Sequence, residues 1–253
     1  MKITLKDGSV KEYAESKSVY EIALDISEGL ARAACAGEVN GEVVDLRTVV
    51  SEDCELSILT ANDEKGLAAL RHTASHVLAE AVKRLYPEAK LAIGPSIDTG
   101  YYYDFEHAPF SNEDLETIEK EMKKIIKEGA KIERFELPRA EAIALMEEKG
   151  EPYKVELIND LPEDSVISFY RQGEFVDLCA GPHLMSTKGV KAFKLISSSG
   201  AYWRGNENNK MLTRIYGTAY ATKDELKEHL EQMEEAKRRD HNKLGREMKI
   251  FTT

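Results

Sequence analysis

Cysteine is scarce in this chain of 253 residues, which contains only Cys35, Cys54 and Cys179. An odd number of widely spaced cysteines is not a disulfide framework, so we expect three reduced thiols in a cytoplasmic protein. Long apolar runs are missing too, and residues 1–8 lack the apolar stretch of a signal peptide. These absences predict a chain that makes no contact with a membrane.

A surplus of basic residues is also missing. The 35 Lys and Arg residues are outnumbered by 46 Asp and Glu residues, which gives a formal net charge of −11. This balance argues against a protein that binds nucleic acids through its bulk charge. The acid is unevenly spread, however. Residues 1–62 hold 6 basic and 12 acidic residues, whereas residues 186–216 hold 6 basic residues against Glu207 alone. The composition therefore still allows a local contact with a nucleic acid.

Residues 1–62 show the pattern of a small β-grasp domain. Alternating apolar residues predict a hairpin over residues 3–13, and a capping box at residues 18–21 introduces one amphipathic helix over residues 19–30. The pattern then returns to strands, the last of which is predicted at residues 55–59. A hairpin, a helix and further strands in this order favour the β-grasp arrangement.

The rest of the chain is predicted to form a larger α+β domain over residues 63–223, followed by a long linker helix over residues 224–253. Helical periodicity and capping signals predict helices at residues 67–86, 111–129 and 138–150. Strand-like runs occur at residues 101–105, 132–135, 166–170, 174–178 and 211–216. This order indicates a mainly antiparallel sheet.

Two histidines lie on one face of the first of these helices. His72 and His76 are four residues apart, so their imidazoles follow one another along a face nearly opposite to the apolar stripe. Helix packing does not require them there, and a pair of surface histidines is the alternative interpretation. A metalloprotease is excluded, because its motif has a glutamate directly after the first histidine and this chain has Thr73.

A second motif follows a predicted strand. Cys179 ends the strand, and the turn at Gly181-Pro182 allows His183 to return toward its sulfur atom. Taken separately, a buried structural thiol and a loop histidine would explain these residues. Together with His72 and His76 they provide three imidazoles and a thiol, a set suited to tetrahedral zinc or to the activation of water.

With both motifs in place, the sequence resembles the N-terminal half of the bacterial threonyl-tRNA synthetase family. Residues 1–62 are similar to its TGS domain, and residues 63–223 to its editing domain, whose hallmark is the pair of motifs His-x3-His and Cys-x3-His. Further matching stretches are Gly94-Pro95 and residues 98–104, 200–205 and 208–219. The editing domain of alanyl-tRNA synthetase and its free-standing homologues share the four-residue site. The β-grasp domain and the Ala-Tyr-Trp-Arg-Gly stretch favour the threonyl family.

The resemblance implies a hydrolytic reaction. Threonine and serine differ by one methyl group, which is worth only about 1–3 kcal/mol of discrimination in a pocket. A second site that hydrolyses seryl-tRNA(Thr) to serine and tRNA(Thr) would supply the missing fidelity. Two alternatives stay open, namely a zinc-dependent trans-editing hydrolase of the alanyl type and a tRNA-binding module without catalysis.

The resemblance also assigns roles to individual side chains. We expect His72 to act as the base, either directly or by orienting water. The pocket would be shaped, and the seryl group bound, by His76, Cys179 and His183. Lys154 matches a family lysine implicated in catalysis, although a solvated surface charge is the alternative interpretation. Tyr103 and Asp177 are further candidates for positioning the substrate.

The cofactors and partners follow from the same resemblance. The threonyl family works without a metal at this site, so we expect none. If zinc is bound, its ligands are expected to be His72, His76, Cys179 and His183. ATP, magnesium and an amino-acid-binding zinc belong to a class II catalytic domain, which the family places after a helix like residues 240–248. That domain is absent here, so we expect no aminoacylation and a monomer. The expected partners are tRNA(Thr) mischarged with serine and the catalytic and anticodon-binding domains.

Overall fold

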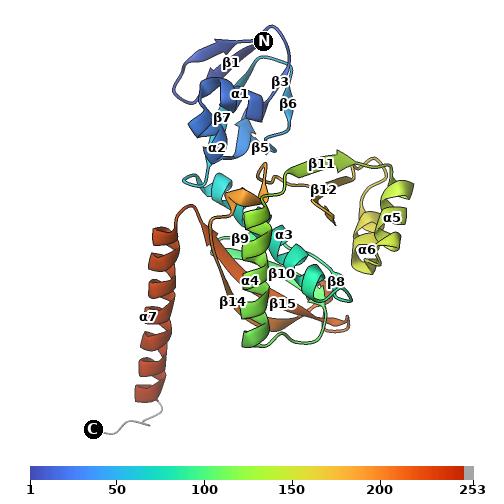
Figure 1. The fold of residues 1–253 in the computed structure, drawn as a ribbon, viewed down its shortest axis with the longest axis vertical. Coiled ribbons are helices and arrows are strands. Elements are labelled where there is room, and N and C mark those ends of the chain that lie inside the picture. The colour runs from blue at the N-terminus through green and yellow to red at the C-terminus, as the bar shows by residue number, and fades with distance from the viewer. Residues whose placement is uncertain (248–253) are drawn as a thin grey trace.

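The computed structural model describes residues 1–247, with side chains as far as Arg239. It is an α+β structure in which a small N-terminal domain lies at one end and a larger domain follows (Figure 1). The C-terminal helix α7 (Lys223–Glu247) extends away from the larger domain. The end of the predicted linker helix, residues 248–253, lies outside the described residues. No helix within residues 1–247 combines the length and the apolar character needed to cross a membrane.

The N-terminal domain has the predicted β-grasp fold. Its sheet has the order β2-β1-β7-β4-β5, with β1 parallel to β7 and the other neighbours antiparallel. These strands are β1 (Lys2–Leu5), β2 (Val10–Glu12), β4 (Ala34–Val39), β5 (Glu42–Val44) and β7 (Cys54–Thr60). A separate pair is formed by β3 (Lys17–Ser18) and β6 (Val49–Val50). Ile3, Ile22 and Leu56 are buried in the core between the sheet and helix α1 (Val19–Ile26).

The single helix predicted over residues 19–30 is in fact two helices. Ser18 and Glu21 form the expected capping box at the start of α1. Ser27 then adopts an extended conformation, ends α1 and accepts a hydrogen bond from the backbone N–H of Leu30, so it caps α2 (Glu28–Ala33). A serine side chain competes for backbone hydrogen bonds, and for this reason it interrupts a helix even where the apolar periodicity continues.

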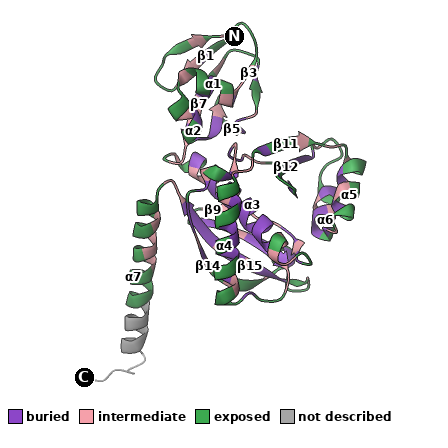
Figure 2. Ribbon diagram, viewed as in Figure 1, coloured by how far each residue is buried: buried purple, intermediate pink, exposed green. Residues whose placement is uncertain are grey.

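The larger domain is built around α3 (Glu64–Leu85), which is buried along most of its length (Figure 2). Its main sheet has the antiparallel order β14-β15-β10-β8, with β9 paired to β10. The strands are β8 (Lys90–Leu91), β9 (Ser96–Ile97), β10 (Gly100–Glu106), β14 (Ala192–Tyr202) and β15 (Met211–Tyr220). Leu78, Tyr101 and Ile215 are fully buried in the core that α3 shares with this sheet and with α4 (Asn112–Glu128).

Besides the two-residue strands β8 and β9, two longer elements of this domain differ from the sequence expectations. Strand β14 is the longest in the described chain, yet it was not predicted, because residues 197–200 are small and polar and have weak strand propensity. Pairing along the whole of β15 holds it in place. Helix α6 (Pro152–Asp160) was not predicted either, although Pro152 at its first turn is a recognised helix-start signal.

A second, smaller sheet carries the cysteine motif. Strands β11 (Ile132–Glu136), β12 (Ser168–Gln172) and β13 (Phe175–Leu178) are antiparallel neighbours. Helices α5 (Arg139–Glu148) and α6 lie beside this sheet in Figure 1, and Met146, Ile158 and Phe169 belong to a core of their own. Because β13 ends next to α3, it brings its following residue, Cys179, to the face of α3 that carries the histidines.

Candidate functional site

Helix α3 presents two imidazoles to a third from the β13 loop. The ring centroids of His72 and His76 are 5.3 Å apart, and those of His183 lie 4.2 Å from His72 and 4.1 Å from His76. His76 is 4% exposed and His183 is fully buried, while His72 is partly exposed. The face of α3 opposite its apolar stripe is therefore covered, and the interpretation as a surface pair is excluded.

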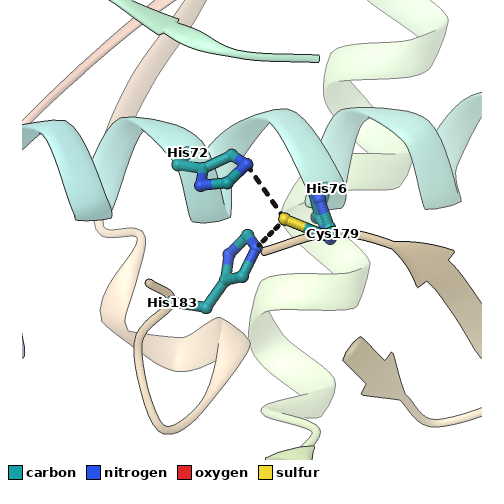
Figure 3. A group of neighbouring side chains, drawn as sticks. All are labelled: His72, His76, Cys179 and His183. Carbon is teal, nitrogen blue, oxygen red and sulfur yellow. Dashed lines mark hydrogen bonds between the residues drawn. The ribbon is translucent and has the colours of Figure 1, made fainter. Parts of the chain in front are cut away.

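Cys179 reaches the same point from the end of β13. Its backbone N–H donates to the carbonyl of Ser168 at 3.1 Å, and the hydroxyl of Ser168 donates to the carbonyl of Cys179 at 2.6 Å. The chain then turns at Gly181-Pro182, and His183 returns toward the sulfur. The Sγ atom of Cys179 lies 3.3 Å from Nε2 of His72 and 3.2 Å from Nε2 of His183 (Figure 3).

The hydroxyl of Thr73 determines which nitrogen of His183 carries the proton. Thr73 Oγ1 donates its only hydrogen to the carbonyl of Ala69 at 2.9 Å and accepts from the backbone N–H of Leu184 at 3.0 Å. Nδ1 of His183 lies 3.2 Å from the same oxygen. With the hydroxyl hydrogen directed to Ala69, Nδ1 is the donor in this contact. The network therefore assigns the Nδ1–H tautomer to His183 and leaves its Nε2 lone pair directed at Cys179.

Burial sets the protonation state of the cluster. It lowers the pKa of His72 to about 4 and the pKa of His76 to about 3, and it holds the pKa of His183 well below its ordinary value. Burial also raises the pKa of the Cys179 thiol to about 12. Without a metal, the cluster thus contains three neutral imidazoles and a thiol at neutral pH. The imidazoles are able to accept a proton, whereas a protonated thiol is a poor nucleophile.

Lys154 is buried on α6 and is not a solvated surface charge. Its Nζ lies 2.7 Å from Oδ1 of Asp177. The other oxygen of Asp177, Oδ2, accepts a hydrogen bond from the hydroxyl of Tyr103 at 2.6 Å and lies 3.5 Å from Nε2 of His76. Burial alone would raise the pKa of Asp177, but attraction to Lys154 and His76 and these hydrogen bonds outweigh it and lower that pKa.

All seven side chains that the sequence singled out therefore belong to one connected group. Sequence reasoning missed the contact of Thr73 with His183, although the position of Thr73 next to His72 on α3 could have suggested it. It also missed Asp45 and Arg47, whose side chains contact the backbone of His183 from the N-terminal domain. No local pattern could have revealed these two, since Asp45 precedes His183 by 138 residues.

The donor set fits a zinc ion. One donor atom from each of His72, His76, Cys179 and His183 lies within 4.8 Å of the others. Tetrahedral zinc with bonds of about 2.0–2.3 Å holds its ligand atoms roughly 3.3–3.8 Å apart, close to the contacts around Cys179. A zinc ion would polarise an ester carbonyl or a water molecule only if one of these four residues left a coordination position open, because a tetrahedral ion held by all four is closed. Its binding would require Cys179 to lose the proton that burial retains.

Comparisons with known proteins agree with this architecture. Residues 1–60 match the family model of the TGS domain, and residues 167–216 match that of the threonyl and alanyl tRNA synthetase second additional domain. A threonine--tRNA ligase of Clostridium botulinum (strain Eklund 17B / Type B) is 67% identical over 254 residues, which cover 100% of this chain and 39% of that protein. A threonine--tRNA ligase of Acetivibrio thermocellus is 66% identical over 252 residues, which cover 99% of this chain and 40% of that protein.

The β-grasp domain and the following domain with its histidine and cysteine motifs define an aminoacyl-tRNA synthetase region of the TGS and editing-domain type. The chain belongs to the threonyl-tRNA synthetase family and corresponds to its N-terminal region, which contains both domains. It spans about 40% of the length of the curated relatives named above.

Proposed function

We propose that this chain hydrolyses the ester bond of seryl-tRNA(Thr) and releases serine and tRNA(Thr). The observation that carries the proposal is the convergence of three neutral imidazoles and a thiol within 4.8 Å of one another. A buried ion pair between Lys154 and Asp177 lies directly beside them. An aminoacyl ester has a good leaving group, so such a site needs mainly a positioned water, a base and stabilisation of the oxyanion.

His72 is the best placed of the three imidazoles to act as the base. It alone is partly exposed, so a water molecule beside the substrate is able to reach it. His183 is fully buried and its Nδ1 is engaged by Thr73, and buried His76 faces Asp177. These residues are therefore assigned to shaping the pocket and holding the seryl group. Because the pKa of His72 is lowered to about 4, its base form is present throughout the neutral range.

Lys154 supplies the positive charge of the proposed site. Its ammonium group would offset the negative charge that develops on the ester carbonyl oxygen during attack by water. Asp177 holds the ammonium group in place through the ion pair, and the hydroxyl of Tyr103 holds Asp177 through a hydrogen bond. Asp177 and Tyr103 therefore position the substrate indirectly, by holding Lys154 in place.

The proposal extends to the organisation of the chain and to its partner. We assign residues 1–62 to the TGS domain, residues 63–223 to the editing domain and residues 224–253 to a linker toward a class II catalytic domain. The partner is tRNA(Thr), of which the editing domain has to hold only the acceptor end. Four of the six basic residues within 186–216 lie on the hairpin of β14 and β15 and are ion-paired with carboxylates, namely Lys194, Arg204, Lys210 and Arg214. We therefore assign the local positive charge for that contact to Lys188 and Lys191, which precede β14.

Deacylation of seryl-tRNA(Thr) by the purified chain tests the proposal, with threonyl-tRNA(Thr) as the substrate that should be spared. We expect His72→Ala and Cys179→Ala to lose hydrolysis while they still bind tRNA in a filter-binding assay. His229→Ala is the matched control, because His229 lies on α7 against Tyr220 and outside the cluster. Normal hydrolysis by both site variants would reject the enzymatic function, and tRNA binding without hydrolysis by the unaltered chain would favour a binding module.

We further propose that hydrolysis proceeds without a metal. Zinc analysis of chain purified without added zinc, combined with deacylation after chelation, tests this point. We expect hydrolysis to persist in chelator. Stoichiometric zinc together with loss of activity on chelation would instead favour a zinc-dependent hydrolase of the alanyl type, with the same four residues as ligands.

A further inference from the structure

Two side chains of the N-terminal domain bind the backbone of a site residue in the larger domain. Oδ2 of Asp45 accepts a hydrogen bond from the backbone N–H of His183 at 3.1 Å, and Nη1 of Arg47 donates to the carbonyl of His183 at 3.2 Å. The same guanidinium donates to the carbonyl of Leu184 at 2.8 Å and to that of Ile132 at 3.1 Å. Both backbone polar groups of His183 are therefore held by the β-grasp domain. We call Asp45 and Arg47 the interdomain clamp.

The clamp is itself fixed by its surroundings. Oδ1 of Asp45 accepts from the backbone N–H of Arg47 at 2.8 Å and from its Nη1 at 2.9 Å. Oδ2 also accepts from the hydroxyl of Tyr170 at 2.9 Å, and the ring of Tyr170 packs against that of His183 with centroids 4.4 Å apart. Asp45 is only 8% exposed. A buried carboxylate whose acceptor sites are all used is a rigid anchor, because any shift breaks several hydrogen bonds together.

We propose that Asp45 and Arg47 are positioning residues for ester hydrolysis, so that the β-grasp domain forms part of the editing machinery. This inference rests on the proposed function of the cluster. Within the larger domain, Thr73 holds the ring of His183, but the main chain of His183 is held by the clamp. If the main chain moved, Nε2 of His183 would leave its place beside Cys179. Misplacement of a site group by about 1 Å can lower a rate about 100-fold.

The isosteric change Asp45→Asn tests the clamp. An amide has one acceptor oxygen where the carboxylate has two, so it is unable to accept from Arg47 and from His183 and Tyr170 together. We expect kcat for seryl-tRNA(Thr) to fall at least about tenfold while KM stays within about twofold, because the variant leaves the proposed contacts with the body of the tRNA unaltered. Glu38→Gln is the matched control. Glu38 is also a carboxylate of the N-terminal domain and pairs with Lys65 of α3, but it has no contact with His183. We expect it to retain the original kcat.

A second measurement does not depend on hydrolysis. Nitrogen-15 NMR of labelled histidines reports the tautomer and surroundings of His183. We expect its imidazole signals to move in Asp45→Asn but not in Glu38→Gln. Arg47→Lys is the second variant if Asp45→Asn does not fold, because it keeps the charge but has no fork of donors for three carbonyl groups. Unchanged kcat or unchanged His183 signals in a folded clamp variant would overturn the proposal. If the unaltered chain does not hydrolyse seryl-tRNA(Thr), the proposed function fails, and the NMR comparison alone then decides whether the clamp positions His183.

Discussion

The Nζ atom of Lys154 lies 2.7 Å from Oδ1 of Asp177, and neither side chain is more than 4% exposed. The same carboxylate accepts a hydrogen bond from Tyr103 and approaches His76, so it connects the ammonium group to the imidazole cluster. Removing one partner of a buried ion pair leaves an unpaired charge, whereas replacing both partners leaves none. The contribution of Lys154 to the stability of the fold and its contribution to catalysis can therefore be measured separately.

We expect Lys154→Met to lower the free energy of unfolding by about 3–5 kcal/mol and to abolish hydrolysis. The double variant Lys154→Met with Asp177→Asn should recover much of that stability, because it buries no unpaired charge. It should remain inactive, because no ammonium group faces the ester oxygen. Urea denaturation measures the first quantity and seryl-tRNA(Thr) deacylation the second. A double variant that regains both would show that Lys154 serves folding alone.

Thr73 provides a test of the assigned tautomer. Thr73→Val keeps the shape of the side chain but removes the oxygen that accepts from Nδ1 of His183 and from the backbone N–H of Leu184. We expect hydrolysis to fall at least about tenfold, with a loss of about 1–3 kcal/mol of stability for the unpaired groups. Thr73→Ser keeps the hydroxyl and should stay within about threefold of the original rate. Equal activity of the valine and serine variants would contradict the assignment.

Acid should destabilise the metal-free chain through its buried histidines. Their folded pKa values, about 4 for His72, about 3 for His76 and well below the ordinary value for His183, lie below the unfolded value near 6.5. Below pH 6.5 the unfolded state therefore binds more protons than the folded state, and stability falls as the pH drops toward the folded values. Each histidine contributes up to about 1.4 kcal/mol per pH unit in that window.

Urea denaturation in chelator at pH 7, 6 and 5 measures this slope. His76→Gln replaces one buried imidazole by a side chain that does not titrate. The difference in bound protons between the unfolded and folded states should therefore fall by about one, and the free energy of unfolding should change less steeply with pH. His107→Gln, at a histidine outside the cluster, is the comparison variant. If His76→Gln has the same slope as the unaltered chain, the imidazole of His76 is not held neutral by burial.

The sequence predicted most of the fold because local signals agree with the tertiary structure. Helix α4, for example, begins at the capping box of Ser111 and ends at Gly129, which has the left-handed conformation expected of a terminal glycine. Strand β14 has no such signal, since its small polar residues are held by pairing with β15. Even Ser27, a strong capping residue, was overlooked because the apolar periodicity continues beyond it.

The site was also predictable in part from local sequence signals. The spacing of His72 and His76, and of Cys179 and His183, can be read within single segments of the chain. The burial of Lys154 cannot, because it depends on Asp177 from a different element. Contacts between domains, such as those of the interdomain clamp with His183, depend on how two separately folded units meet.

Gly181 offers the sharpest test of the loop geometry, because a matched glycine exists. Gly181 and Gly173 both have positive φ, +79° and +58°. A Cβ added at Gly181 would lie 2.0 Å from the hydroxyl oxygen of Tyr170, whereas one added at Gly173 would meet nothing within 4 Å. Gly173→Ala should therefore cost only the backbone strain of about 1–2 kcal/mol and retain full hydrolysis.

Gly181→Ala carries the same strain and also displaces the Tyr170 hydroxyl, which donates to Asp45 of the interdomain clamp. We expect a larger loss of thermal stability than in Gly173→Ala and a fall in kcat of at least about tenfold, because His183 follows Gly181 by two residues. Thermal melting and seryl-tRNA(Thr) deacylation of both variants provide the comparison. Equal stability and equal activity in the two would mean that the contact between Gly181 and Tyr170 does not determine the position of His183.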